Sequence, residues 1–219
     1  MINPADTAQF SENCRACPRL AKFLDKVRAE HSDYHARPVS PFGANKARLL
    51  IVGLAPGMHG ANRSGRPFTG DYAGILLYQT LYKFGFASAP VSTQRDDGLK
   101  LNNCRITNAV KCLPPQNKPE TREIKQCNRY LADELTAMPQ GSVILALGTV
   151  AHLAVLLATG AKRSAYPFAH AARHDLDGRT LVDSYHCSRY NTQTRRLTTD
   201  MFERVFVDIA AILKQSRRA

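Results

Sequence analysis

The chain has 219 residues, of which 44% are hydrophobic, and this is enough to bury the core of one globular domain over residues 1–219. Thirty Lys and Arg against eighteen Asp and Glu leave a formal net charge of +12, which attracts nucleic acid or, equally well on charge alone, keeps the chain soluble. No run of about 18 apolar residues occurs and the first residues lack a signal-peptide pattern, which argues against a membrane protein and predicts a cytoplasmic one.

Hydrophobic periodicity predicts alternating helices and strands. The chain begins with an expected amphipathic helix over residues 18–31 and a loop over residues 32–47. Four short apolar runs are the expected strands, at residues 48–53, 104–110, 142–148 and 179–185. Later helical patterns cover residues 72–86, 121–138, 149–160 and 197–215.

Strands that alternate with helices favour a parallel sheet with helices on both faces. We therefore expect a three-layer α/β/α fold with a central four-stranded, mainly parallel sheet. The dipeptide Asp177-Gly178 is a hairpin signal, so residues 169–176 are expected to pair antiparallel with the last strand. In such a sheet, ligands bind beyond the carboxyl ends of the strands.

Four of the six cysteines have the spacing of a metal site. Cys14 and Cys17 form a C-x2-C pair, and Cys112 and Cys127 form a second pair separated by fourteen residues. Cytosolic thiols stay reduced, so metal binding explains these pairs better than disulfides. A zinc ribbon would normally have a second tight pair, but spacing alone does not decide between zinc and an iron–sulfur cluster. The remaining two cysteines are expected to be buried: Cys104 and Cys187.

Polar loops follow three of the expected strands. The first carries Phe68 and Asp71 with several basic and amide residues, the second begins at Asn108, and the last runs over residues 186–191. We expect these side chains to converge at one sheet edge. Taken singly, each has a simpler explanation: Asp71 as a helix N-cap, Asn108 as a turn former and His186 as a partly buried histidine with satisfied hydrogen bonds.

The motifs, taken in order, resemble those of the family 5, or B-type, uracil-DNA glycosylases. They are C-R-A-C-P, G-L-A-P-x-x-H-G-x-N-R-x-G-R-P-F-T-G-D, N-A-V-K-C-x-P-P and H-x-S-R-x-N, and they run from Cys14 to about Thr198. Leu54 and Ala55 favour the B-type, because other branches have an acid at one of these positions. The sequence departs from the family at Cys187, where Pro is usual.

The resemblance implies a fold with a four-stranded parallel sheet and a structural [4Fe–4S] cluster on Cys14, Cys17, Cys112 and Cys127. It also implies hydrolysis of the N-glycosidic bond of uracil in DNA, which leaves an abasic site; removal of deaminated purines such as hypoxanthine and xanthine is a further expectation that the sequence does not decide. No lysine falls in the motifs except Lys111, so no covalent lysine intermediate is expected.

Each predicted site residue has an expected role. The flipped base would stack on Phe68 and be read by Asn108, while His186 donates to its O2 and Asp71 orients the attacking water. The other predicted substrate-binding residues are Gly53, Ala55, Asn62, Arg63, Arg66, Ser188, Arg189, Tyr190 and Asn191. Tyr190 is the candidate wedge in the base stack, and phosphate contacts are expected from Arg63, Arg66, Arg189, Arg195 and Arg196.

Two other functions compete with this interpretation. One is a non-enzymatic iron–sulfur module that binds damaged DNA, and the other is a zinc-stapled hydrolase of free nucleotides. If the protein acts on DNA, either as a uracil-DNA glycosylase or as a damage-binding module, we expect a monomer that works on nucleoid DNA in the cytoplasm.

Overall fold

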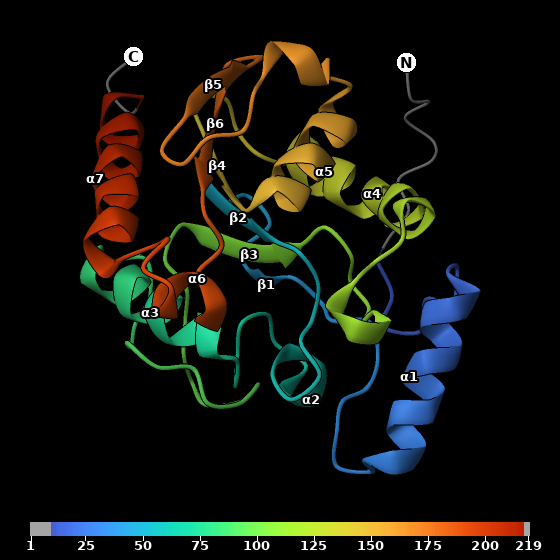
Figure 1. Ribbon diagram of the computed structural model, residues 1–219. Coiled ribbons are helices and arrows are strands. Elements are labelled where there is room, and N and C mark those ends of the chain that lie inside the picture. Colours follow the sequence, from blue (N-terminus) through green and yellow to red (C-terminus); the bar gives the residue numbers. More distant parts are fainter. Residues whose placement is uncertain (1–9, 217–219) are drawn as a thin grey trace.

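The computed structural model describes residues 10–216, and its centre is a six-stranded sheet (Figure 1). Residues 1–9 and 217–219 of the expected domain lie outside the described residues. The strand order is β1-β3-β2-β4-β6-β5. The four inner strands are parallel and match the four predicted runs: β2 (Leu49–Gly53), β3 (Cys104–Asn108), β4 (Val143–Leu147) and β6 (Arg179–Ser184).

The two edge strands are antiparallel to their neighbours, which corrects the expected four strands to six. Strand β5 (Arg173–Leu176) pairs with β6 and confirms the hairpin predicted from Asp177-Gly178. Strand β1 (Phe42–Gly43) pairs with β3 inside the segment predicted to be a loop. A two-residue strand has no alternation of its own, so hydrophobic periodicity could not indicate it.

Among residues 10–216, five helices are longer than ten residues, and all five overlap predicted helices. They are α1 (Pro18–Glu30), α3 (Tyr72–Lys83), α4 (Thr121–Thr136), α5 (Thr149–Thr159) and α7 (Thr199–Gln215). Shorter turns lie in the predicted loops: α2 (Ala61–Ser64), η2 (Pro115–Asn117), η3 (Arg163–Ala165) and α6 (Arg189–Gln193). Within residues 10–216, no helix combines the length and apolar character that crossing a membrane requires.

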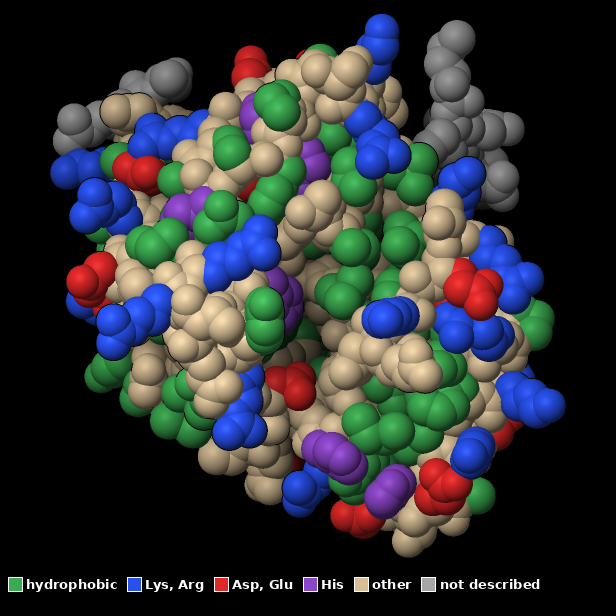
Figure 2. Space-filling model, viewed as in Figure 1, with side chains coloured by type: hydrophobic (Ala, Val, Ile, Leu, Met, Phe, Trp, Pro, Cys, Tyr) green, Lys and Arg blue, Asp and Glu red, His purple; other side chains and the backbone are tan. Residues whose placement is uncertain are grey.

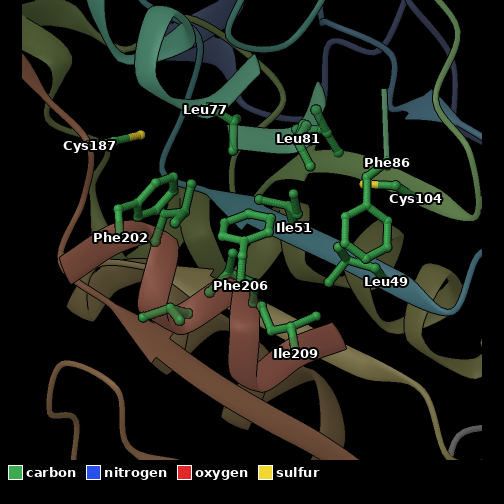
Figure 3. Close-up of a cluster of buried hydrophobic side chains, with 14 of the residues drawn as sticks. Leu49, Ile51, Leu77, Leu81, Phe86, Cys104, Cys187, Phe202, Phe206 and Ile209 are labelled. Carbon is green, nitrogen blue, oxygen red and sulfur yellow. The ribbon is translucent and has the colours of Figure 1, made fainter. Parts of the chain in front are cut away.

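One face of the sheet is covered by α3 and α7. Leu49 and Ile51 of β2 point to this side, where they belong to the same buried cluster as Leu77 of α3 and Phe206 of α7 (Figure 3). The next residues along β2 face the other way, because successive side chains of a strand alternate between the faces.

The opposite face is covered by α4 and α5. Leu50 and Val52 of β2 pack there in one cluster with Leu131 of α4 and Val155 of α5. Because both faces of β2 are buried, every residue of this strand is buried, and its sequence is a continuous apolar run rather than an alternating one. This arrangement gives the three layers expected from the sequence.

Helix α1 lies outside these layers, at one end of α4 (Figure 1). Leu20 and Val27 of α1 form a third buried cluster with Val110, after β3, and with Tyr130 of α4. Pro18 begins the helix at a position where a missing N–H costs nothing, and Cys17 is its N-cap residue. The packing of α1 therefore holds the first cysteine pair against the segment that follows β3.

Candidate active site

A pocket of about 510 Å³ opens at the carboxyl ends of the parallel strands. Seven of the predicted site residues line it: Ala55, Phe68, Asp71, Asn108, His186, Ser188 and Arg189. The space-filling view shows this face hollowed near its centre, with Lys and Arg side chains around the hollow (Figure 2). The convergence that the strand order predicts at this sheet edge is therefore present in the structure.

Asp71 is the only acidic residue among the described residues that line the pocket. Although it precedes α3 as the N-cap residue, its carboxylate makes no capping hydrogen bond to that helix. Instead, Oδ2 accepts a hydrogen bond of 3.2 Å from the backbone N–H of Ala61. A Cβ on Gly60 would lie 1.8 Å from Asp71 Oδ1, so only glycine leaves room for this carboxylate. Burial raises the pKa of Asp71, and the Ala61 N–H and His59 oppose that shift.

Asn108 and Phe68 meet behind the pocket at Gly53. Asn108 ends β3 directly opposite Gly53 of β2 and is only 4% exposed. A Cβ on Gly53 would lie 2.4 Å from Asn108 Oδ1 and 2.7 Å from Phe68 Cζ. The absence of a side chain at Gly53 therefore lets the amide and the ring lie side by side. Phe68 has a φ of 57°, a left-handed conformation that is strained for an aromatic residue and is typical of functional sites.

His186 follows β6 and lies beside Phe68. The two ring centroids are 6.0 Å apart and the rings are inclined by 27°. Burial lowers the pKa of His186 to about 4, so the imidazole is neutral at pH 7 and keeps one N–H as a donor. Asn191 steadies the loop, because its Nδ2 donates to the backbone carbonyl of His186 at 2.8 Å.

The ladder between β2 and β3 continues beyond the ends of both strands. The N–H of Ala109 donates to the carbonyl of Gly53 at 2.9 Å, and the N–H of Val110 donates to that of Leu54 at 3.0 Å. Cys112 follows two residues later. The two residues after Asn108 are thus held by β2 and its continuation, and the chain then bends to reach Cys112, the third predicted metal ligand.

The four predicted metal ligands line one small cavity together with Leu20 and Tyr130. None of the six cysteines forms a disulfide. The hydroxyl of Tyr130 donates to Cys14 Sγ and the N–H of Lys111 donates to Cys127 Sγ, both at 3.3 Å. Burial raises the pKa of Cys17 to about 11, and the neighbouring cysteines add to that shift. Four converging thiols in a largely apolar cavity, two of them accepting hydrogen bonds, fit a four-thiolate metal centre.

Comparisons with known proteins show which family of enzymes contains this chain. Residues 40–210 match the family described as the uracil DNA glycosylase superfamily. The type-5 uracil-DNA glycosylase of Thermus thermophilus is 47% identical over 201 residues, which cover 89% of this chain and 91% of the relative. The Mycobacterium leprae protein of the same description is 41% identical over 214 residues, or 94% and 93% of the two chains. This chain belongs to the type-5 uracil-DNA glycosylases.

Type-4 relatives are more distant from this type-5 chain. The type-4 uracil-DNA glycosylase of Pyrobaculum aerophilum is 32% identical over 149 residues, or 68% and 62% of the two chains, whereas the type-5 protein of that organism is 41% identical over 203 residues, or 91% and 88%. This difference agrees with the B-type prediction that rests on Leu54 and Ala55. Both residues line the pocket and leave it without a second acid.

Six predicted substrate-binding residues of this type-5 chain do not line the pocket: Gly53, Asn62, Arg63, Arg66, Tyr190 and Asn191. Arg66 is 4% exposed and forms an ion pair with Asp97 at 2.7 Å, so its guanidinium is engaged inside the protein. Asn62 is fully buried, and its amide donates to the carbonyl of Met58 at 3.5 Å. Both residues belong to the loop between β2 and α3 and make these contacts inside the protein in this structure, and their expected roles toward substrate stay predictions.

The other predicted DNA contacts lie on the surface. Tyr190 is 71% exposed at the start of α6, and Arg63, Arg195 and Arg196 are also exposed. Arg63 lies with its guanidinium 5.9 Å from the ring centroid of Tyr34. These side chains are available to a large ligand that approaches the pocket.

Six residues that line the pocket are not among the predicted site residues: Leu54, Gly57, Ala61, Tyr72, Ala73 and Asn117. Asn117 and Tyr72 line the pocket, the former from the left-handed turn η2 with a φ of 56°. The polar segment after the second predicted strand already included Asn117, but a single asparagine among prolines carries no signal of its own. Cys104 and Cys187 are fully buried in the cluster that α3 and α7 cover (Figure 3), as expected for residues outside the metal site.

Proposed function

We propose that this chain is a DNA-repair enzyme that hydrolyses the N-glycosidic bond of uracil in DNA and leaves the free base and an abasic site. Membership of the type-5 uracil-DNA glycosylases supports this function. The observation that carries it is the meeting of Asp71, Asn108 and His186 in one pocket. Together they offer a carboxylate, an amide and a neutral imidazole, which are the groups that base excision needs.

Uracil must leave the duplex before it can reach this pocket, at a cost of a few kcal/mol that is lowest for a mispaired base. The pocket, at about 510 Å³, has room for a single flipped base. Phe68 supplies a flat apolar ring for stacking. The Asn108 amide makes no hydrogen bond to another described residue, so both its donor and its acceptor are free to read the edge of the base.

His186 would stabilise the leaving base. As the glycosidic bond breaks, negative charge develops on the base, and a donor at its O2 lowers the barrier. Since the pKa of His186 is lowered to about 4, the imidazole acts as a neutral N–H donor and does not need to be protonated beforehand. Asn191 would keep this donor in place through the His186 carbonyl.

Asp71 would orient the water that attacks the sugar. The sugar becomes cationic in the transition state, and an ionised carboxylate in a poorly solvated pocket stabilises it more strongly than one in bulk water. The hydrogen bond from the Ala61 N–H fixes one oxygen and leaves the other for water. No lysine lines the pocket within the described residues, which supports simple hydrolysis without strand cleavage.

The DNA backbone would be held by exposed basic residues around the pocket: Arg63, Arg189, Arg195 and Arg196. With a net charge of +12, binding should weaken steeply with salt as counterions are released. Tyr190 would fill the gap that the flipped nucleotide leaves in the stack. We further propose that the protein works as a monomer on nucleoid DNA in the cytoplasm.

The four cysteines would hold a [4Fe–4S] cluster. When bound, the cluster supplies a covalent cross-link between parts of the chain and takes no part in hydrolysis. Cys14 and Cys17 precede or begin α1, Cys112 follows β3 and Cys127 belongs to α4. The cross-link would therefore secure α1 to the segment behind the pocket.

The direct test is incubation of the purified brown protein with a labelled duplex that contains one G·U pair, followed by alkali. We expect strand cleavage at that position only after alkali, because excision leaves an alkali-labile abasic site. Matched G·C duplex is the control, and duplexes with hypoxanthine or xanthine test the wider base range. Intact DNA that is nonetheless retained tightly would favour the damage-binding module, and turnover of free deoxyuridine in preference to DNA would favour a nucleotide hydrolase.

The pH dependence of single-turnover excision should follow Asp71. The rate requires the ionised carboxylate, so it should fall as the pH is lowered through a pKa that burial has raised above the ordinary aspartate value. His186 stays neutral down to about pH 4, so no change is expected near pH 6.5, where a free histidine titrates. The variant His186→Gln should excise uracil more slowly, but its rate should still fall at low pH as in the wild type. A rate that falls as the pH rises through 6.5 would contradict a neutral His186.

A further inference from the structure

Three ionisable side chains meet at the opposite side of the sheet from Phe68. His152 comes from α5, His174 from β5 and Asp183 from β6, and one nitrogen or oxygen atom of each lies within 4.8 Å of the others. His152 and Asp183 are 1% and 0% exposed. His152 Nδ1 is 2.8 Å from Asp183 Oδ1, and His174 Nε2 is 3.4 Å from Asp183 Oδ2. None of the three lines the active-site pocket.

Two atoms of this group form no well-aligned hydrogen bond among the described residues, although they make a long ion pair with each other. They are His174 Nε2 and Asp183 Oδ2, both shielded from solvent. A buried carboxylate oxygen and a buried imidazole nitrogen are costly to leave unsatisfied, and native proteins rarely do so without a ligand or ordered water. The two atoms face one another across 3.4 Å. A cation between them would satisfy both.

The outer nitrogen of His152 indicates the same kind of ligand. His152 Nε2 is 2.9 Å from the backbone carbonyl of Tyr166, and because a carbonyl can only accept, this nitrogen carries the proton. His152 Nδ1 and Asp183 Oδ1 lie 2.8 Å apart and share a proton, which an ion bound by both residues would displace. Metal-binding histidines typically have this arrangement, in which the nitrogen away from the metal donates to a backbone carbonyl and fixes the ring.

We propose that His152, His174 and Asp183 bind one divalent transition-metal ion, of which zinc fits best. Imidazole and carboxylate ligands suit zinc, whose bonds of about 2.1 Å place tetrahedral ligands about 3.4 Å apart. All three ligands lie on regular elements, and a water molecule would complete the coordination. The ion would cross-link α5 to β5 and β6. Asp183 precedes His186 by three residues, so the ion is a structural support for the strand that leads into the pocket.

Zinc binding to the intact, cluster-loaded protein tests the proposal. Protein freed of loosely bound metal would be dialysed against zinc sulfate, and zinc and iron would be measured together with thermal unfolding. We expect one zinc per chain in addition to the iron, and a Tm that rises with zinc concentration. Because the iron count is measured in the same sample, zinc that replaces the cluster on the cysteines is recognised by the loss of iron.

The decisive variant is His174→Gln, since His174 lies on the edge strand β5 and its change is less disruptive than one at fully buried Asp183. We expect zinc affinity to fall by at least about 100-fold, as removal of a direct ligand should cost no less than removal of an outer one. His31→Gln, which changes a histidine next to α1, should keep both the zinc and its effect on Tm. A wild-type Tm that is insensitive to zinc, or zinc that stays bound in His174→Gln, would overturn the proposal and leave a buried ion pair only.

Discussion

Asp71→Asn should lower the single-turnover rate of uracil excision from a G·U duplex by about 10²–10⁴-fold, the usual contribution of a positioned general base. Asparagine has nearly the same shape and can still accept the hydrogen bond from the Ala61 N–H, so the loop should keep its structure. What it lacks is the negative charge that orients water and stabilises the cationic sugar. DNA affinity should change little, because the exposed arginines are untouched.

Asp33→Asn provides a matched control for that experiment. Asp33 is an exposed carboxylate outside the pocket, and its loss should leave the excision rate within about twofold of the wild type, as for most surface substitutions. A rate for Asp71→Asn close to the control would remove Asp71 from the chemistry. Excision would then depend on His186, Asn108 and the distortion of the flipped nucleotide.

Cys127→Ala should remove the bound iron and lower the free energy of unfolding by several kcal/mol, on the order expected when a structural metal centre is lost. The reason is that the cluster would join the N-terminal cysteine pair, the segment after β3 and α4. Without it, α1 is held against α4 by apolar packing and by the ion pair between Arg19 of α1 and Glu123 of α4. Iron content, visible absorbance and thermal unfolding measure the effect.

Cys104→Ala is the control for the cluster, because Cys104 is equally buried but belongs to the hydrophobic cluster under α3 and α7. It should keep its iron and colour and lose only the small free energy of a core truncation. Iron that survives in Cys127→Ala, or is lost to the same extent in both variants, would argue against the four-cysteine assignment. Zinc in place of iron would leave the protein colourless with the same ligand dependence.

The two central parallel strands could be predicted because burial on both faces makes their sequences continuously apolar. Residues 48–53 and 142–148 therefore stand out from the polar loops around them. Strand β1 could not, since Phe42 and Gly43 become a strand only through contacts distant in sequence: Arg105 of β3 donates to the carbonyl of Gly43 at 2.7 Å. No local pattern records such a contact.

Contacts between residues distant in sequence also explain why two arginines of the loop after β2 differ in exposure. Arg63 and Arg66 have the same chemistry and lie three residues apart, yet one is exposed and the other is buried against Asp97. The partner is 31 residues further along the chain, in a segment without a motif. The places of Asn108 and His186 were predictable for the opposite reason, because Asn108 ends β3 and His186 follows β6, and the direction of both strands is fixed by the strand alternation. Asp71 instead lies in the long loop after β2, directly before α3.

The strand extension beyond Asn108 limits how this protein can be redesigned. Only three residues separate Asn108 from Cys112, and the first two of them are hydrogen-bonded to Gly53 and Leu54. A chimera that takes its base-recognition segment from another branch would also move a cysteine, and a change that shifts Cys112 would move the amide that reads the base. Base preference and metal loading must therefore be engineered as a single unit, with the partner strand carried along.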